Sequence, residues 1–270
     1  MRHGLLPSLM TMVFVLACRT GGSAAAPASP TASPRVHRAS ANPPVEVHGA
    51  LREMMHEGRT GPVVEVSRAT GAPDSVAVGA LAGLTGEVTV LDGEAWLSYA
   101  EADGTARTVR TRTPSDSAAL LVVGQLPNAQ WVTLEEDLPL ATLSDRIAAL
   151  AQARGVDLSR PVPFTIEGPL LDLAWHVVDG RKLQSGPSSH QAHAAAGVQG
   201  RRASTTGVLV GFYSSQHHGI FTHHDSDTHV HVVLAEENAS GHVDGVTVGR
   251  GARVRLPAPS APAPREGTQP

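Results

Sequence analysis

The sequence predicts a β-dominated α+β fold, in which a mixed sheet lobe is followed by a barrel-like β lobe that carries a metal site. About ten short apolar runs are separated by turn residues, which is typical of strands and hairpins. Apolar residues recur at helical spacing only over residues 45–57 and 142–154. Ten of the 14 histidines lie between His176 and His242, and this concentration indicates the metal site in the second lobe.

Both ends of the 270-residue chain are unsuited to a hydrophobic core. Residues 1–18 combine an early positive charge with a short apolar run that ends in Cys18, which indicates an export signal. Residues 19–44 and 257–270 are rich in Ala, Ser and Pro, so we expect a disordered tether and a disordered tail. A single domain is therefore predicted over residues 45–256.

Cys18 is the only cysteine in the chain. Its place after Val15, Leu16 and Ala17 resembles the lipobox of bacterial lipoproteins, in which the thiol receives lipid and becomes the new N-terminus. We expect an exported protein that is anchored to a membrane through Cys18. If the signal is an ordinary one, the protein is secreted or periplasmic. The domain itself has no disulfide, so its core or a metal ion must stabilise it.

Charge and composition narrow the range of partners. A net charge of −4 and a pI near 6.4 provide no basic face for nucleic acid. The chain has four Phe, three Trp and two Tyr, so its core must consist mainly of Val, Leu and Ala. We expect a small-molecule substrate, no nucleic-acid partner, and membrane contact only through lipid on Cys18. The composition is also compatible with a homodimer.

The first half of the domain is predicted to begin with a helix and to continue with strands. Residues 45–57 have one apolar face at helical spacing. The dipeptides Asp92-Gly93 and Asp103-Gly104 are typical of hairpin turns. The strands that these patterns indicate cover residues 63–66, 83–90, 94–99, 105–112, 118–126 and 130–134.

The second half of the domain is predicted to contain one helix and then strands. Residues 142–154 place Leu143, Ile147 and Leu150 on one helical face, and Gly155 suits the position after the helix. The strands that follow are expected over residues 162–166, 170–178, 207–213, 228–234 and 242–248.

Three histidines near the end of the domain are predicted metal ligands. His229 and His231 are two residues apart on a predicted strand, so both side chains point to one face. A turn that pivots between Glu236 and Glu237 would place His242 directly opposite His231. Three imidazoles on one patch, with a fourth position open, suit a divalent metal ion and most of all Zn²⁺.

The alternative is that this strand face is exposed and that its histidines bind nothing. Two histidine pairs precede the strand in a polar loop, His217-His218 and His223-His224. We expect these four side chains to be solvated, or to bind metal only adventitiously.

Three motifs occur in a fixed order along the domain. Residues 86–93 (GEVTVLDG) form a strand and turn, and residues 207–213 (GVLVGFY) form a later strand. His229, His231 and the Gly-His-Val of residues 241–243 follow. Together these motifs resemble the α-acetolactate decarboxylase family. The family's three zinc-ligating histidines have the same spacing, and its glutamate-bearing strand is similar to residues 86–93.

The resemblance runs from about Leu51 to Val248 and implies a metal-dependent enzyme that converts 2-acetolactate to acetoin and CO₂. It implies that Glu87 is the active-site glutamate, which would act as a general acid/base. The alternative for Glu87 is an exposed carboxylate beside a turn. No redox cofactor is expected, because decarboxylation of a 2-hydroxy-3-keto acid needs only a Lewis acid and a proton donor.

Two positions depart from the family pattern. The family carries an arginine eight residues past the glycine of an Ile-Asp-Gly turn. Here the glycine is Gly168, and the corresponding residue is His176. The family also brings a second glutamate from its C-terminal tail, whereas the tail of this chain contains only Glu266. A protonated His176 would take the arginine's place beside the substrate carboxylate, without its bidentate fork.

Three other functions stay open at this point. The metal site would serve a lyase that acts on another small hydroxy or keto acid, which the missing arginine favours. It would also serve a zinc-binding lipoprotein without turnover, which the histidine-rich loop favours. The spacing of His229, His231 and Glu236 is similar to the cupin metal motif, but the flanking glycines do not match.

Overall fold

The computed structural model describes residues 44–183 and 186–259. Cys18, the predicted export signal, and nearly all of the predicted tether and tail lie outside the described residues. Within the described part of the chain, none of the helices has the length and apolar character needed to cross a membrane.

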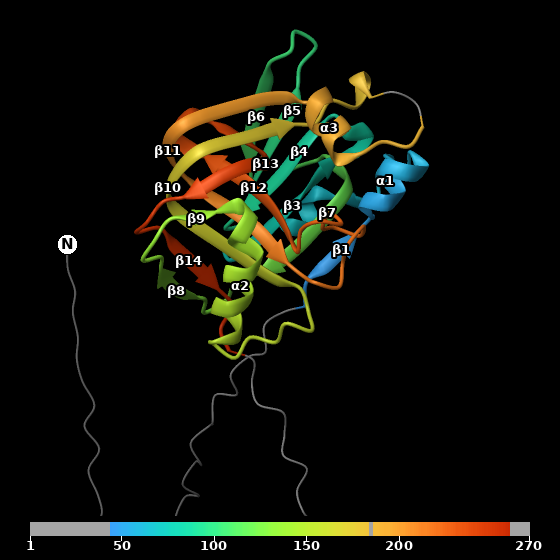
Figure 1. The fold of residues 1–270 in the computed structure, drawn as a ribbon. Helices are drawn as coiled ribbons and strands as arrows, with labels where there is room; N and C mark the ends of the chain where they lie inside the picture. The colour runs from blue at the N-terminus through green and yellow to red at the C-terminus, as the bar shows by residue number, and fades with distance from the viewer. Residues whose placement is uncertain (1–43, 184–185, 260–270) are drawn as a thin grey trace, which may run out of the picture. The chain divides into compact units, whose positions relative to one another are not determined.

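The first of two sheets is built from the N-terminal half of the domain (Figure 1). Each pairing between its strands is antiparallel, and hairpins join β3 to β4, β4 to β5 and β5 to β6. The predicted mixed sheet is therefore an antiparallel one. In spatial order its strands are β1 (Glu46–His48), β7 (Ser117–Gln125), β3 (Ser75–Leu81), β4 (Gly86–Leu91), β5 (Glu94–Ala100) and β6 (Ala106–Thr111), with β2 (Val64–Glu65) also paired to β7.

The second sheet is built mainly from the C-terminal half. Its order is β8 (Gln130–Thr133), β14 (Arg253–Leu256), β10 (Val162–Val177), β11 (Val198–Tyr213), β12 (Thr228–Leu234), β13 (Ala239–Val248) and β9 (Leu138–Pro139). β13 pairs with β10 as well as with β12, so His-bearing strands lie on both sides of it. The β-dominated fold is confirmed, and the barrel-like character of the second lobe stays a prediction.

Three α-helices accompany the sheets in the described residues. They are α1 (Leu51–Glu57), α2 (Leu143–Gln152) and α3 (His190–Ala196). Short 3₁₀ helices cover Val66–Ala69, Ala82–Leu84, Leu140–Thr142, Gly180–Lys182 and Ala235–Glu237.

The sequence-based helix over residues 45–57 is wrong in its first half. Glu46–His48 pairs with β7, and Gly49 follows with a φ of 80°, which a helix cannot continue. The helix therefore begins at Leu51, and it ends at Gly58 in the left-handed region as its glycine suggests. Helix α2 matches its prediction and buries its apolar stripe.

Two further elements differ from the prediction in an instructive way. All seven residues of β3 are buried, so its sequence SVAVGAL lacks the alternation that marks a half-exposed strand, and it was not predicted. The two strands expected over residues 162–166 and 170–178 are one strand, β10, which continues through Gly168 and is irregular between Leu171 and Trp175. The irregularity decides which residues near its end face β13.

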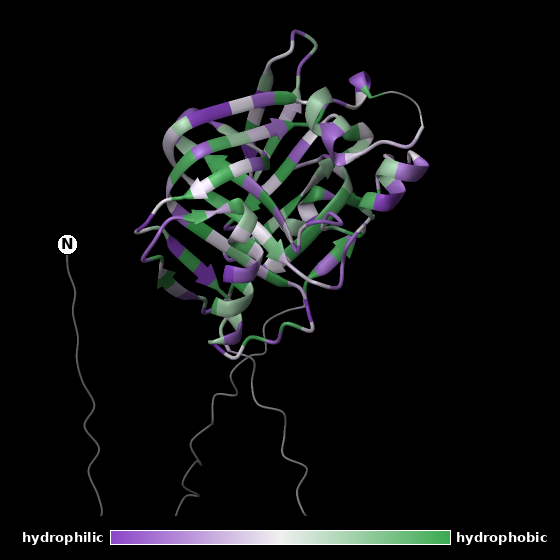
Figure 2. Ribbon diagram, in the orientation of Figure 1, coloured by the Kyte–Doolittle hydropathy of each residue, from purple (hydrophilic) through white to green (hydrophobic). Residues whose placement is uncertain are grey.

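A shared core joins the two sheets. Val78 on β3 and Leu120 on β7 belong to the same buried cluster as Val210 and Phe212 on β11. Figure 2 shows hydrophobic residues along the strands of both sheets. β4 also contacts β12 and β13 of the second sheet, so side chains on β4 reach the histidines on those two strands.

Gly124 on β7 packs against β10 and β11 of the second sheet, and its replacement by valine is expected to destabilise the fold. A Cβ atom there would lie 2.9 Å from the ring of Phe212 and 3.0 Å from Pro163. Overpacking of this kind costs about 1–3 kcal/mol, to be measured by urea unfolding. Gly61→Ala is the control, because a Cβ at Gly61 has nothing within 4 Å. An unchanged midpoint for Gly124→Val would contradict this description of the interface.

Candidate metal centre

The hairpin between β12 and β13 has the register that the sequence predicts. His231 on β12 pairs directly with His242 on β13. The turn is the 3₁₀ helix Ala235–Glu237, followed by Asn238 with a φ of 49°. Asparagine is one of the few residues that adopt this left-handed conformation at low cost. The prediction that His242 faces His231 is therefore confirmed.

His229 and His231 point to the same buried face of β12. Their Nε2 atoms lie 3.2 Å apart, and two nitrogens bound to one tetrahedral zinc at ~2.0–2.1 Å would lie about 3.3 Å apart. The Nδ1 atom of His231 lies 2.9 Å from the hydroxyl of Thr89, which also accepts a hydrogen bond from Ser240. When Nδ1 carries the proton and donates it to Thr89, Nε2 keeps its lone pair for a metal ion.

The ring of His242 completes a group of three imidazoles, which we call the inner cluster (His229, His231 and His242). Its centroid lies 5.1 Å from that of His229 and 5.5 Å from that of His231. Three imidazoles on one tetrahedral ion have centroids about 5.2 Å apart. Buried Nδ1 atoms of His229 and His242 have no hydrogen-bond partner among the described residues. Among the described residues, however, the groups whose donor atoms all lie within 4.8 Å of one another are His190, His223 and His242, and His176, His242 and Asp244, so the ring of His242 would have to turn before the inner cluster could share one ion.

The protonation state of the inner cluster also suits a metal ion. Burial lowers the pKa of all three imidazoles, that of His242 to about 4. Neighbouring imidazoles lower these pKa values further, because positive charges on adjacent rings repel. The rings are therefore neutral near pH 7, which is the form that binds a metal.

His176 lies in the same row of the sheet, because it pairs with His242 across β10 and β13. Its ring centroid is 5.1 Å from that of His242, and its Nδ1 atom is 2.8 Å from the carboxylate of Asp244. Burial alone would lower the pKa of His176, but the hydrogen bond to Asp244 and the charge of Glu87 raise it overall. When His176 is protonated, it forms an ion pair with the partly exposed Asp244.

Glu87 reaches this row from β4 of the other sheet. Its side chain is buried, so the alternative of an exposed carboxylate is wrong. One carboxyl oxygen lies 3.9 Å from Nε2 of His176, and the other lies 3.9 Å from Nε2 of His231. Burial raises the pKa of Glu87 to about 7, although His176 and a hydrogen bond from the N–H of Val178 oppose the shift. Its carboxyl can therefore hold or release a proton near neutral pH.

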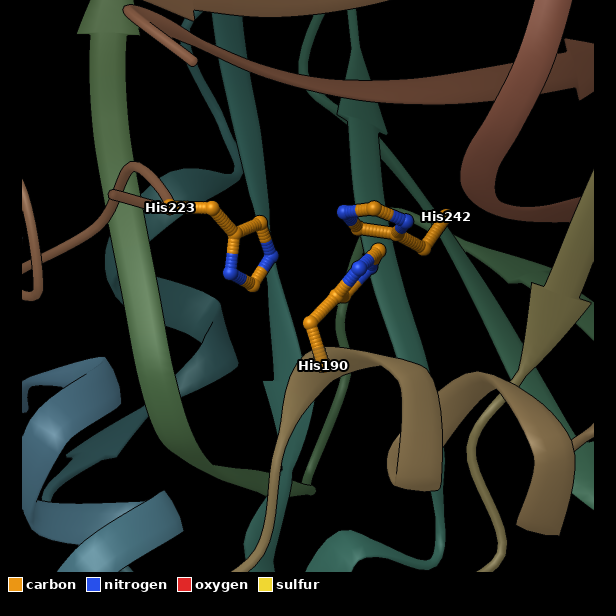
Figure 3. A group of neighbouring side chains, drawn as sticks. All are labelled: His190, His223 and His242. Carbon is orange, nitrogen blue, oxygen red and sulfur yellow. The ribbon is translucent and has the colours of Figure 1, made fainter. Parts of the chain in front are cut away.

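Two further histidines approach His242 from outside the sheet. His190 is the first residue of α3, and His223 lies in the loop between β11 and β12. Their ring centroids are 4.0 Å apart, and that of His190 is 5.0 Å from His242. Figure 3 shows these three rings turned toward one another. The expectation of a solvated His223 is therefore wrong, whereas its neighbour His224 is exposed.

Three of these residues were not identified from the sequence. Asp244 carried a usable signal, because it is two residues from His242 on one strand and so shares its face. His190 and His223 belong to the concentration of histidines that indicated a metal site, and His223 was expected at most to bind metal adventitiously, but no spacing placed either ring beside His242. They belong to a short helix and an irregular loop, where spacing along the chain does not indicate direction.

A buried neighbour of this site, His193 on α3, makes the fold sensitive to acid. Its Nε2 atom lies 2.6 Å from the hydroxyl of Ser188. Burial lowers its pKa to about 4, and the charges of His176 and His190 add to the effect. The unfolded chain, with an ordinary histidine pKa of about 6.5, binds this proton more readily, so stability is lost as pH falls from 6.5 to 4.

Replacing His193 with glutamine should therefore reduce the loss of unfolding free energy that occurs as the pH falls from 6.5 to 4. We expect the wild type to lose on the order of 2 kcal/mol more than His193→Gln over this pH range. Urea unfolding at several pH values measures the difference. The exposed His56, replaced in the same way, should leave the pH profile unchanged. Parallel profiles for wild type and His193→Gln would contradict the assignment.

Solved structures of similar fold include acetolactate decarboxylases. An alpha-acetolactate decarboxylase from Bacillus subtilis strain 168 superposes with a TM-score of 0.61 at 18% identity, over 79% of this chain and 86% of that one. An acetolactate decarboxylase from Bacillus subtilis subspecies spizizenii gives 0.63 at 16% identity, over 80% and 86%.

A Staphylococcus aureus protein of unknown function, described as similar to alpha-acetolactate decarboxylase, gives 0.62 at 17% identity, over 79% and 85%. At these identities the likeness establishes the fold. A search of the curated proteins gives no match. The model of the family described as Alpha-acetolactate decarboxylase matches residues 70–258, which include β4 and the histidine-bearing strands β10, β12 and β13. The chain belongs to the alpha-acetolactate decarboxylase family.

Proposed function

We propose that this protein is a metal-dependent decarboxylase that converts 2-acetolactate to acetoin and CO₂. One observation carries the proposal within this family. The buried carboxyl of Glu87 lies 3.9 Å from a nitrogen of His231 and 3.9 Å from a nitrogen of His176. A group that can donate a proton thus lies between a candidate metal ligand and a second imidazole.

The ligands of the metal would be His229, His231 and His242, and the donor set of three neutral imidazoles suits Zn²⁺. When bound there, a divalent ion supplies Lewis-acid stabilisation of negative charge on the substrate's oxygen atoms. Thr89 would hold His231 in orientation through its Nδ1 atom.

Glu87 would deliver the proton that the reaction requires. Loss of CO₂ breaks a carbon–carbon bond and leaves the electron pair on the former carboxylate-bearing carbon. With a pKa of about 7, Glu87 is partly protonated at neutral pH and can transfer its proton to that carbon. The resulting carboxylate would then recover a proton from solvent before the next turnover.

His176 would orient the carboxylate of the substrate. Its imidazole is held by Asp244, whose negative charge favours the protonated form. The partly open cavity beside Glu87, His176 and His229 has a volume of ≈ 40 Å³, against ≈ 520 Å³ for the hollow that adjoins it. The rest of the substrate would therefore extend into the adjoining hollow lined by Thr228 and Asp244.

The test is acetoin formation from racemic 2-acetolactate by the purified, zinc-loaded protein. We expect acetoin well above the uncatalysed background, and its loss after chelation. Metal-free protein with zinc restored is the control for chelator effects. Zinc-loaded protein that produces no acetoin above background would exclude this substrate.

A lyase that acts on another small hydroxy or keto acid is the second candidate. The observation that favours it is His176, which offers a substrate one ring nitrogen where the family has a guanidinium fork. CO₂ release from a panel of 2-hydroxy-3-keto acids distinguishes the two candidates, because a shifted specificity would give a better substrate than 2-acetolactate.

We also propose that the protein is exported and held to a membrane by lipid on Cys18. Wild-type protein expressed with its signal should partition into the detergent phase, and Cys18→Ser should move to the aqueous phase. Detergent partitioning by Cys18→Ser would contradict the lipid anchor.

A further inference from the structure

His242 lies next to two pairs of imidazoles. The ring centroids of His229 and His231 lie 5.1 and 5.5 Å from that of His242, and Figure 3 shows the rings of His190 and His223 turned toward it. The donor atoms of His190, His223 and His242 all lie within 4.8 Å of one another, and the ring centroids of the last two are 5.9 Å apart. We call these three residues the outer cluster. Two nitrogens on one tetrahedral zinc are about 3.3 Å apart, so modest ring rotations would bring the outer cluster onto one ion.

The outer cluster offers lone pairs rather than protons. Burial lowers the pKa of His190, and burial with neighbouring imidazoles lowers that of His223 to about 3. Both rings are neutral at pH 7. The Nε2 atom of His190 is buried without a hydrogen-bond partner among the described residues, which is costly unless another ligand engages it.

Carboxylates beside the outer cluster would offset the charge of a cation. Asp244 and Asp225 both act on His190 through their negative charge. One oxygen of Asp244, Oδ2, is buried and has no hydrogen-bond partner in the described part of the chain. Imidazole ligands with a nearby carboxylate suit zinc and other divalent transition metals.

We propose that His190, His223 and His242 form a second position for a divalent transition-metal ion, which alternates with the inner cluster. Both positions use His242, and a neutral imidazole ligates one ion at a time. The outer cluster also lines the open hollow next to Asp225 and Thr228, whereas His229 and His231 are buried behind it. An ion that enters through this hollow reaches the outer cluster first.

The inference goes beyond the decarboxylase function and does not depend on turnover. The experiment measures bound zinc by elemental analysis after desalting, together with affinity by competition with a chromophoric chelator. The starting variant is His229→Gln/His231→Gln, which removes the inner cluster and leaves His242. We expect it to retain about one zinc ion per chain, bound more weakly than in the wild type.

Two further variants assign that ion to its ligands. Adding His190→Gln/His223→Gln to the starting variant should abolish zinc binding. Adding His217→Gln/His218→Gln instead should leave it unchanged, because these loop histidines bind to Ser214 and Asp227 rather than facing His242. A folded starting variant that holds no zinc would overturn the proposal. Zinc content that is insensitive to His190 and His223, or equally sensitive to His217 and His218, would overturn it as well.

A second measurement applies if near-UV circular dichroism shows that the starting variant does not fold. His190→Gln/His223→Gln in the wild-type background keeps the inner cluster intact. Its metal-free form should take up zinc at least several-fold more slowly than the wild type, while reaching the same final content. An unchanged uptake rate would overturn the proposal, and a failed acetoin assay would leave this result unaffected.

Discussion

Replacing Glu87 with glutamine is expected to lower kcat for acetoin formation by roughly 10²–10⁴-fold. The amide has nearly the same shape as the carboxyl but has no proton to transfer at neutral pH. In the wild type, burial raises the pKa of this group to about 7, which matches a proton donor to the working pH. Steady-state rates of acetoin formation with matched zinc content measure the effect.

Two controls separate this loss from general damage. Glu136 is exposed, so Glu136→Gln should keep the wild-type rate. The zinc content of Glu87→Gln should equal that of the wild type, because the metal ligands in our proposal are all histidines. A rate within about twofold of the wild type would mean that another group delivers the proton.

Replacing His231 with alanine should remove activity and the zinc ion of the inner cluster. Its side chain is completely buried, and its Nε2 atom lies 3.2 Å from that of His229. Without it the inner cluster has two imidazoles, too few to hold zinc in a three-ligand site with an open position. Acetoin formation should fall to the uncatalysed background. Under the alternating-position proposal, any residual zinc would then depend on His190 and His223.

His218→Ala is the matched control for His231→Ala. His218 is an exposed loop histidine whose Nε2 atom lies 2.7 Å from Asp227, so zinc content and rate should be those of the wild type. Loss of His231 also leaves Thr89 without one of its hydrogen-bond partners, so near-UV circular dichroism must show that the variant is folded. A folded His231→Ala protein with full activity would rule out the inner cluster as the catalytic metal site.

Local pattern was sufficient for the elements nearest the metal centre. Between Thr228 and Val248 the sequence predicts the strand register, because a single short turn joins the two strands and determines which of their residues pair. The hairpin at Asp92-Gly93 follows the same logic, and both turn residues have positive φ. Pattern was insufficient for β3, whose full burial removes alternation, and for Glu46–His48, which pairs with a strand about 75 residues later.

The sequence by itself determined the family resemblance, the facing pair His231 and His242, and the shared side of His229. These depend on strand periodicity and on one short turn, both of which are local. Only the tertiary structure decided that Glu87 is buried, because it lies on a different sheet 144 residues before His231. The tertiary structure likewise decided that His190 lies beside His242. Packing of segments that are distant in the sequence brings these two rings together, and no periodic pattern along the chain indicates it.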